Sequence, residues 1–286
     1  MPPLAILLLL ASALLHALWN MLLKQSDIKY VAMNWQVLLS GAAAIIVLFF
    51  LGLPPRDLWP FAIASTILEV LYFLLLMYAY TDHDFSLIYP IARGAAPALV
   101  VIWAAIFLRE IPTTGGLVGI LLIVVGMVII GSTSLLNNHE NKPHLKGIFL
   151  ALGVALIISI YTIVDGTAVK AHPTAALPYA LSMFAFVPFL TTPVIGRQFG
   201  WAPFARAWRE QPWKLILGGV MGVVAYTTAL FAYSFAPLNY SEAIREVSVV
   251  IGAFLGWRFL NEKMGGYRLL GAGVIFAGIS LIAILG

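Results

Sequence analysis

The sequence predicts an all-α integral membrane protein with ten transmembrane helices, arranged as two inverted five-helix repeats. Hydrophobic residues make up 62% of its 286 residues and charged residues only 10%, whereas soluble domains contain about 45–50% apolar and about 25% charged residues. The apolar residues are grouped in stretches of about 20, the length at which a helix crosses the hydrocarbon core of a bilayer. One pattern of residues also occurs twice, 152 positions apart, which indicates an internal duplication.

Ten apolar stretches are long enough to span a bilayer, and most connections between them are short. Short connections make consecutive helices antiparallel neighbours. The first stretch lacks the positive residues that precede the apolar core of a signal peptide and stays apolar as far as Leu23, so we expect it to be retained. The predicted spans are Leu4–Leu23, Val31–Leu51, Leu58–Tyr80, Ser86–Leu108, Gly115–Ser132, Gly147–Val169, Ala175–Ile195, Trp213–Phe235, Tyr240–Leu260 and Gly266–Leu285.

A polar connection divides the ten spans into five and five. Residues 134–146 are rich in Asn, His, Glu and Lys, and we interpret them as the loop between a first repeat, residues 1–133, and a second repeat, residues 147–286. Because each repeat has an odd number of spans, the two insert with opposite orientation. Inverted repeats of this kind are a common basis of alternating access in transporters.

A second long connection lies within the later half of the chain, at Arg197–Gln211. We expect a polar loop here, with Trp201, Trp208 and Arg209 as anchors at the membrane interface, because Trp is enriched at that level.

The duplicated pattern consists of an arginine, a Phe-Leu-x-Glu sequence and two glycines. Glu110 and Glu262 end their spans, and we expect them to be interfacial or packing residues. Shifting the chain by 152 positions places Arg93 on Arg245, Phe107 on Phe259, Glu110 on Glu262, Gly119 on Gly271 and Gly126 on Gly278.

Composition excludes several classes of function. The mean hydropathy of +0.99 is incompatible with a water-soluble domain. The net charge of +4 comes from Lys and Arg scattered over short connections, without the basic stripe of a nucleic-acid-binding protein. The absence of cysteine excludes thiolate metal sites, and Asp82, His83 and Asp84 fall in a predicted solvated turn. No enzyme motif is present, so we expect neither catalysis nor a cofactor.

Charged residues inside the predicted spans are the strongest functional candidates, because charges at membrane depth are costly and usually mark a pathway. If all of these groups ionise, four acids and two arginines leave a net charge of −2. Either a carboxyl group is protonated or the site expects a positive charge. This favours a zwitterion, a cation or proton coupling over a plain anion. The candidates are Glu69, Arg93, Asp165, Glu242, Arg245 and Glu246, with His16 as a titratable neighbour.

The second arginine has acids on its own helix. Glu242, Arg245 and Glu246 lie at positions i, i+3 and i+4, so we expect two carboxylates to hold Arg245. The group then serves either substrate binding and gating or a purely structural ion-pair cluster.

The first arginine, Arg93, lies between Pro90 and Pro97, which have no counterparts in the second repeat and predict a kink in the fourth span only. Its span contains no acid, so we expect its partner to be Glu69, Asp165 or the anionic end of a substrate, which a guanidinium can bind in bidentate fashion. A permanent pair with Glu69 is the structural alternative. The two acids are candidates to meet an amine or to carry a coupling proton.

Polar and aromatic residues accompany these charges along the helix faces. His16 and Asn20 lie four residues apart, as do Tyr161 and Asp165, and aromatic rings on these faces could cover a cationic group. The predicted substrate-binding residues are Arg93, Glu69, Tyr72, His16, Trp19, Asn20, Asp165, Tyr161, Tyr226, Glu242 and Arg245; the predicted coupling or gating residues are Glu69, Asp165, Pro90, Pro97 and Glu246.

These features resemble the EamA-like, ten-helix branch of the drug/metabolite transporter superfamily. The resemblance implies a basket of ten helices whose central cavity is lined by spans 1, 3, 4, 6, 8 and 9. It also implies transport of amino acids, metabolites, nucleotide sugars or drugs, often as efflux, across the bacterial inner membrane. It depends on the five-plus-five repeat, on Phe107–Glu110 and Phe259–Glu262, and on the paired glycines; Ala13–Asn20 resembles a subgroup linked to phosphonate utilisation.

The orientation in the membrane has two opposed indications. Eleven Lys and Arg residues lie outside the spans or in their terminal turns on the side of the first loop and three on the other, so the positive-inside rule places both termini outside. The resemblance implies cytoplasmic termini. We favour the latter, because inverted repeats hold opposed topological signals.

The sequence therefore predicts a secondary transporter of a small amino-acid-like or zwitterionic metabolite, driven by protons or by exchange, in a monomer or homodimer. One alternative is a transporter of a phosphonate or phosphorylated anion, or a flippase for a lipid-linked group. An alternative of another class is a non-transporting assembly subunit or sensor, for which charges at membrane depth have no purpose.

Overall fold

The computed structural model describes residues 1–82, 85–136, 145–260 and 266–286. Side chains are described for these residues except within 77–91, 131–146 and 260–265. Within these residues the chain is helical and contains no strand. In chain order the elements are α1 (Pro3–Lys24), α2 (Lys29–Leu51), η1 (Arg56–Leu58), α3 (Trp59–Asp82), α4 (Phe85–Trp103), η2 (Ala104–Leu108), α5 (Thr114–Leu136), α6 (Leu145–Ala171), η3 (Pro173–Ala175), α7 (Ala176–Phe199), α8 (Ala202–Glu210), α9 (Pro212–Tyr233), α10 (Leu238–Arg245), α11 (Val247–Leu260) and α12 (Gly266–Leu285).

Seven helices of the described chain are long and apolar enough to cross a membrane. They belong to α1, α2, α3, α6, α7, α9 and α12, and two shorter apolar segments, Ala92–Leu108 and Thr114–Ile130, lie in α4 with η2 and in α5. The all-helical membrane fold class is therefore confirmed. The count of ten spans and the inversion of two repeats stay predictions.

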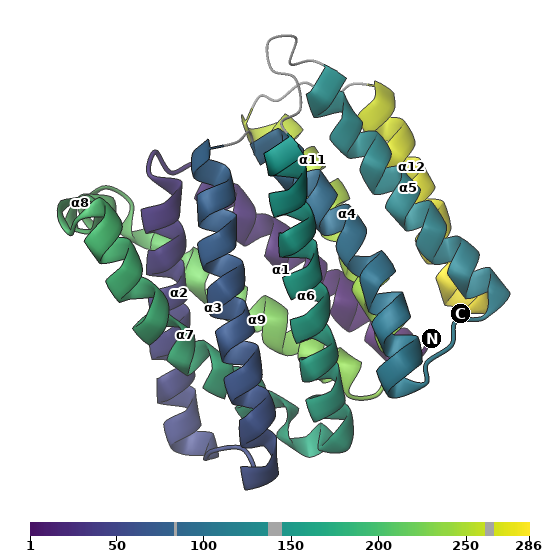
Figure 1. Ribbon diagram of the computed structural model, residues 1–286, viewed down its shortest axis with the longest axis horizontal. Coiled ribbons are helices and arrows are strands. Elements are labelled where there is room, and N and C mark those ends of the chain that lie inside the picture. The colour runs from purple at the N-terminus through teal and green to yellow at the C-terminus, as the bar shows by residue number, and fades with distance from the viewer. Residues whose placement is uncertain (83–84, 137–144, 261–265) are drawn as a thin grey trace.

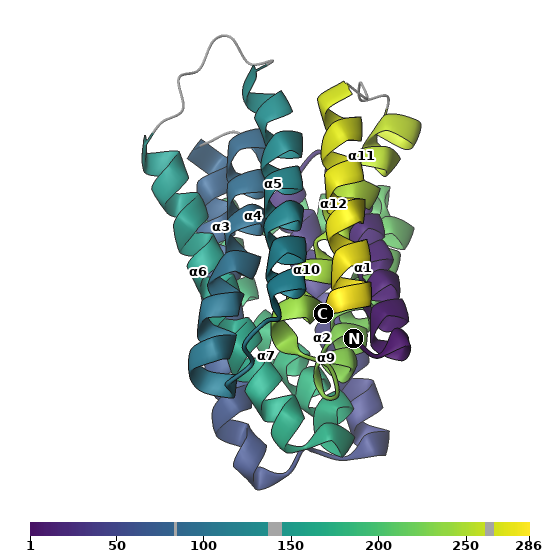
Figure 2. The same ribbon diagram turned by 90° about the vertical axis from the view of Figure 1, so that its right-hand side faces the viewer.

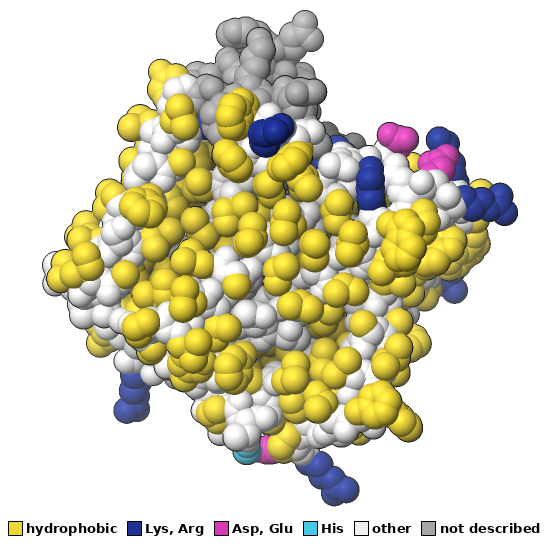
Figure 3. All heavy atoms as spheres, turned by 180° about the vertical axis from the view of Figure 1, so that it is seen from behind, with side chains coloured by type: hydrophobic (Ala, Val, Ile, Leu, Met, Phe, Trp, Pro, Cys, Tyr) yellow, Lys and Arg dark blue, Asp and Glu magenta, His cyan; other side chains and the backbone are white. Residues whose placement is uncertain are grey.

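Large apolar side chains are exposed around the bundle. Phe49, Phe50, Ile111 and Phe276 expose 84%, 79%, 82% and 72% of their surface. On the face shown in Figure 3, hydrophobic side chains predominate and charged side chains lie towards the upper and lower edges. Apolar surface of this extent is not tolerated in water, so the protein is a multi-pass membrane protein that lipid surrounds.

The helices pack in matching pairs. The contact of α1 with α9 corresponds to that of α6 with α3. The contact of α4 with α6 likewise corresponds to that of α10 and α11 with α1. α2 packs against α7, and α5 against α12; Figure 1 shows these two pairs at opposite edges of the bundle. The two chain ends meet (Figure 2), where the Met1 ammonium group donates a 3.2 Å hydrogen bond to the Gly286 carbonyl. This is the pattern expected when two halves contribute equivalent helices.

Glycines from both halves allow α5 and α12 to approach closely. A Cβ atom on Gly119 would lie 2.8 Å from the Gly278 carbonyl oxygen, and one on Gly126 would lie 2.7 Å from the Gly271 carbonyl oxygen. The duplicated glycines of the sequence therefore pack against each other, as small residues do where membrane helices touch.

The predicted ninth span is interrupted, which corrects its continuous range. Glu246 (φ −67°, ψ −9°) separates α10 from α11. Its N–H donates to the Ala243 carbonyl at 3.2 Å, and the Val249 N–H donates to the Glu246 carbonyl at 3.0 Å, a tighter pattern than that of an α-helix. By contrast, α4 continues as an α-helix through Pro90 and Pro97 and becomes π-helical only at η2. The predicted kink of the fourth span is not tested.

The predicted polar loop at Arg197–Gln211 is also wrong, because most of it forms the short helix α8. Phe204 and Ala207 lie three residues apart on one face, and both are buried. Trp35 of α2 donates from Nε1 to the Phe204 carbonyl at 3.0 Å, and its ring lies 4.9 Å from that of Trp208. An apolar face with period 3.6 is enough to fold such a segment once it has a surface to pack against.

The glycine contacts predict a difference between two alanine substitutions on α12. Gly271→Ala should lower the free energy of unfolding by about 1–3 kcal/mol, because its methyl group would meet backbone and Ile130. Gly273→Ala is the matched control, since nothing lies within 4 Å of a Cβ atom there, and it should be neutral or stabilising. Thermal unfolding in detergent measures both, and equal melting temperatures would contradict the close packing.

Candidate functional site

A cavity of about 90 Å³ lies among α1, α2, α3, α4, α6, α7, α9 and α10. A space of this size holds on the order of six to nine water-sized groups. Both halves of the chain contribute to its wall. The predicted binding residues that line it are His16, Trp19, Glu69, Tyr72, Arg93, Tyr161, Tyr226 and Arg245.

The cavity is also lined by α2 and α7, two helices that the resemblance did not imply. From α2 come Gln36 and Ser40, and from α7 comes Phe184. The Gln36 side chain fits beside α9 because residue 218 is a glycine. A Cβ atom on Gly218 would lie 2.1 Å from Gln36 Nε2. The sequence carried a signal that was missed, because two polar residues one turn apart on an apolar span share one helix face.

A second hollow, of about 30 Å³, continues from the first. It shares His16, Trp19 and Arg93 with the cavity and reaches Asn20 and Leu23. These two residues lie near the C-terminal end of α1, which is the end of the bundle away from the chain termini. Asn20 thus lies on the route from the cavity to that end.

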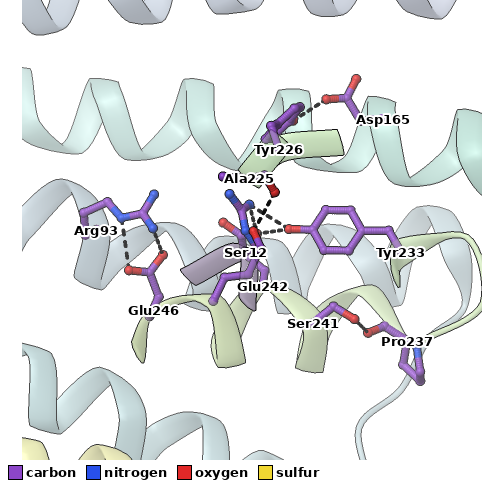
Figure 4. A network of polar contacts seen from close by, with 11 residues as sticks. Ser12, Arg93, Asp165, Ala225, Tyr226, Tyr233, Pro237, Ser241, Glu242 and Glu246 are labelled. Atoms are coloured by element: carbon purple, nitrogen blue, oxygen red, sulfur yellow. Dashed lines mark hydrogen bonds and ion pairs between the residues drawn. The ribbon is translucent and has the colours of Figure 1, made fainter. Parts of the chain in front are cut away.

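Arg93 pairs with Glu246, which corrects the expected partners Glu69 and Asp165. Its Nε donates a 3.0 Å hydrogen bond to Glu246 Oε2, and its Nη2 lies 2.8 Å from Oε1 (Figure 4). The Arg93 side chain is 7% exposed and that of Glu246 is fully buried. The pair joins α4 of the first half to the α10–α11 junction of the second half.

Arg245 pairs with Glu242 but not with Glu246, so only half of the predicted arrangement is correct. Its Nη1 lies 3.0 Å from Glu242 Oε2 and 2.8 Å from the Tyr233 hydroxyl, which itself donates to Glu242. Its guanidinium carbon also lies 5.5 Å from the centre of the Tyr226 ring, within reach of a cation–π contact. Residues 245 and 246 are adjacent, and adjacent residues on a helix do not face each other.

The asymmetry between the two arginines follows from the duplicated sequence. In the second half, Glu242 and Glu246 accompany the arginine; the positions that correspond to them in the first half are Pro90 and Gly94. The first arginine therefore has no acid on its own helix and takes Glu246 from the opposite half. Arg245 keeps the remaining acid, Glu242.

Asp165 is fully buried behind the cavity wall and accepts two hydrogen bonds from tyrosines. The Tyr179 hydroxyl donates to Oδ1 at 2.7 Å. The Tyr226 hydroxyl donates to Oδ2 at 2.5 Å, as Figure 4 shows. Tyr179 was not among the predicted residues, because it lies on α7 and no spacing in the sequence links it to α6. These two hydroxyls hold the carboxylate in place and connect it to the ring beneath Arg245.

Glu69 is half-buried on α3 and faces the cavity. Among the described side chains, no hydrogen bond and no ion pair to its carboxylate is found. Aromatic rings line the same cavity: Tyr72 lies 5.2 Å from Phe73 and 6.1 Å from Tyr161, centre to centre. Glu69 is thus the carboxylate that meets the cavity directly.

The predicted residues of α1 lie close together, with His16 and Trp19 at the cavity wall and Asn20 at the second hollow. The Trp19 and His16 rings are 5.2 Å apart in an edge-on arrangement, and Trp19 Nε1 donates to His16 Nδ1 at 3.4 Å. Asn20 donates to the His16 carbonyl at 2.8 Å. One donor of the Asn20 amide is therefore used within its own helix.

Contacts join the two halves at the end of the bundle that carries the chain termini. We call Glu110, Lys170 and the first turn of α10 the termini-side clasp. Glu110 Oε1 lies 2.8 Å from Lys170 Nζ, and its Oε2 accepts a 2.6 Å hydrogen bond from the Leu238 N–H. Lys170 also donates to the Ala236 carbonyl at 2.7 Å. A carboxylate at this position satisfies an unpaired N–H at the start of α10 and suits the helix dipole.

A second set of contacts joins the halves at the same end. The Thr113 N–H donates to the Tyr240 hydroxyl at 2.8 Å, and the Thr113 hydroxyl donates to the Leu285 carbonyl at 2.6 Å. Glu110 therefore binds residues of the other half and is not among the residues that line the cavity.

Some predictions fall where little or nothing is described. His83, Asp84 and Glu262 lie outside the described residues, and so do the side chains of Asp82 and Pro90. Within the described residues, no group of three acidic or histidine side chains could hold a metal ion.

Comparison with known proteins gives the family. The model of the EamA-like transporter family matches residues 3–132 and again residues 145–284. A solved structure titled "Crystal structure of protein" matches over 98% of this chain and 97% of that chain, with a TM-score of 0.79 and 15% sequence identity, a likeness of fold. No curated protein matches. Because the two family matches together cover nearly the whole sequence, the chain belongs to the EamA-like transporter family.

Proposed function

We propose that the protein is a secondary active transporter that moves a small polar metabolite across the bacterial inner membrane by alternating access. The observation that carries this proposal is the cavity of about 90 Å³, which both halves build and which Glu69, Arg93 and Arg245 reach at the depth of apolar helices. Charged groups at this depth are costly and mark a pathway. An assembly subunit does not need such a cavity, and two opposed halves around one cavity favour transport over sensing.

The two ends of the bundle support a one-sided state. The termini-side clasp joins the halves at one end, while the second hollow leads from the cavity towards the other end. Two matches to one family model and the paired packing of helices support two inverted repeats of five spans, residues 1–133 and 147–286, joined by residues 134–146. Rocking of such repeats about a central site exposes it to each side in turn.

Energy for transport would come from an ion gradient or from exchange, because the sequence contains no P-loop. Both arginines at the cavity are already paired with carboxylates. No contact therefore favours the alternatives in which the substrate is a phosphonate, a phosphorylated anion or a lipid-linked group.

Filling the cavity should stop transport without unfolding the protein. A Cβ atom on Gly222, at the cavity wall, would have Ser40 Oγ at 3.8 Å as its nearest neighbour. Gly222→Leu should therefore fold and reduce transport at least about tenfold, since its side chain takes the substrate's place. Gly273→Leu is the matched control on the outer surface and should transport normally.

The test uses purified protein in proteoliposomes. A thermal-shift screen of amino acids, amines and phosphonates first selects a compound, because a ligand of the native state raises its stability. Counterflow of that radiolabelled compound then compares the wild type with both leucine variants. Failure of the wild type to transport any selected compound, or normal transport by Gly222→Leu, would contradict the proposal.

The termini-side clasp predicts that the cavity can be reached from only one face of the membrane. The chain has no cysteine, so Ser40→Cys provides a single reporter in the cavity wall. A membrane-impermeant thiol reagent should label it from one face only. Adding Lys170→Met breaks the ion pair with Glu110 and should make labelling possible from both faces.

Labelling is measured in right-side-out and inside-out vesicles. Lys29→Met, which removes an exposed lysine at the other end of the bundle, is the control and should leave the labelling one-sided. Equal labelling from both faces before the clasp is broken would show that it does not close this end.

A further inference from the structure

The distribution of charge around the cavity separates one carboxylate from the others. Glu246 and Glu242 each bind an arginine, and Asp165 accepts hydrogen bonds from two tyrosine hydroxyls. Glu69 faces the cavity and, among the described side chains, has neither an ion pair nor a hydrogen bond to its carboxylate. Two carboxylates therefore remain without an arginine, Glu69 and Asp165, and of these only Glu69 lines the cavity.

The arginines do not offer a matching site for an anion. Glu246 binds two nitrogens of Arg93 through both of its oxygens. Arg245 is held by Glu242 and Tyr233 and lies over the Tyr226 ring. A substrate carboxylate or phosphate would bring a further negative charge to arginines whose charges Glu246 and Glu242 already balance.

The wall around Glu69 is aromatic. Tyr72, Phe73, Tyr161, Phe184 and Tyr226 line the cavity. Aromatic faces attract organic ammonium groups, whereas a hard metal cation needs six or more oxygen ligands. The volume of about 90 Å³ admits on the order of six to nine water-sized groups, which fits a small monoamine.

We propose that the substrate is a small organic monocation, whose ammonium group binds the Glu69 carboxylate and whose apolar body packs against Tyr72, Tyr161 and Tyr226. This inference rests on the proposed transport function and replaces the zwitterion that the sequence favoured. Glu69 is then the residue that determines the charge of the substrate.

Three probes of similar shape test the charge preference: benzylamine, benzyl alcohol and benzoate. Their binding to purified wild-type protein in detergent is measured by thermal shift and by isothermal titration calorimetry. Benzylamine should bind about tenfold more tightly than benzyl alcohol, the effect of one favourable charge contact, and benzoate should bind most weakly. Glu69→Gln should bind benzylamine and benzyl alcohol within about twofold of each other.

Two further variants control for changes in the fold. Glu69→Asp keeps the charge and should keep the preference for benzylamine, and Glu210→Gln removes an exposed acid on α8 and should change nothing. Benzoate binding as tightly as benzylamine, or an unchanged preference in folded Glu69→Gln, overturns the proposal. Binding can be measured without transport, so the two proposals can fail separately. Cation-selective binding without counterflow would overturn only the transport function. Counterflow without a preference for cations would overturn only the proposal that the substrate is a cation.

Discussion

The ion pair between Arg93 and Glu246 is the interaction on which the centre of this protein depends. It connects α4 of one half to the α10–α11 junction of the other through two nitrogen–oxygen contacts in a buried site. Each isolated charge at such a site would cost several kcal/mol, so the folded bundle favours the arrangement in which the two residues meet. Glu246 lies where α10 stops and α11 begins, so the interrupted helix and the ion pair occur at the same residue.

The pair also sets the chemistry of the cavity. Because Arg93 is held by the opposite half, and Arg245 by Glu242 and Tyr233, the positive charges serve the framework. The charge that remains for a substrate belongs to Glu69, within an aromatic wall. The same exchange of partners between the halves recurs at the termini-side clasp, where Glu110 of one half binds Lys170 and the start of α10 in the other. Contacts between the two halves thus shape both the centre of the bundle and the end that carries the chain termini.

Sequence reasoning predicted what depends on local pattern and missed what depends on contacts between distant segments. The membrane fold class follows from composition and from apolar stretches of helical length, and the duplicated glycines indeed mark a close helix contact. The short helix α8 was missed because its stability depends on packing against Trp35, which lies on a distant segment of the chain. The partner of Arg93 was missed because Glu246 was assigned to Arg245, although neighbouring residues on a helix point about 100° apart.

A double-mutant cycle on the central ion pair tests this account most directly. The free energy of unfolding in detergent would be measured for wild type, Arg93→Gln, Glu246→Gln and the double variant. Each single variant leaves one buried charge alone and should lose roughly 3–5 kcal/mol, while the double variant should lose clearly less than the sum of the two. Additive losses, or an Arg93→Gln variant as stable as the wild type, would contradict the claim that Glu246, and not a substrate, holds Arg93.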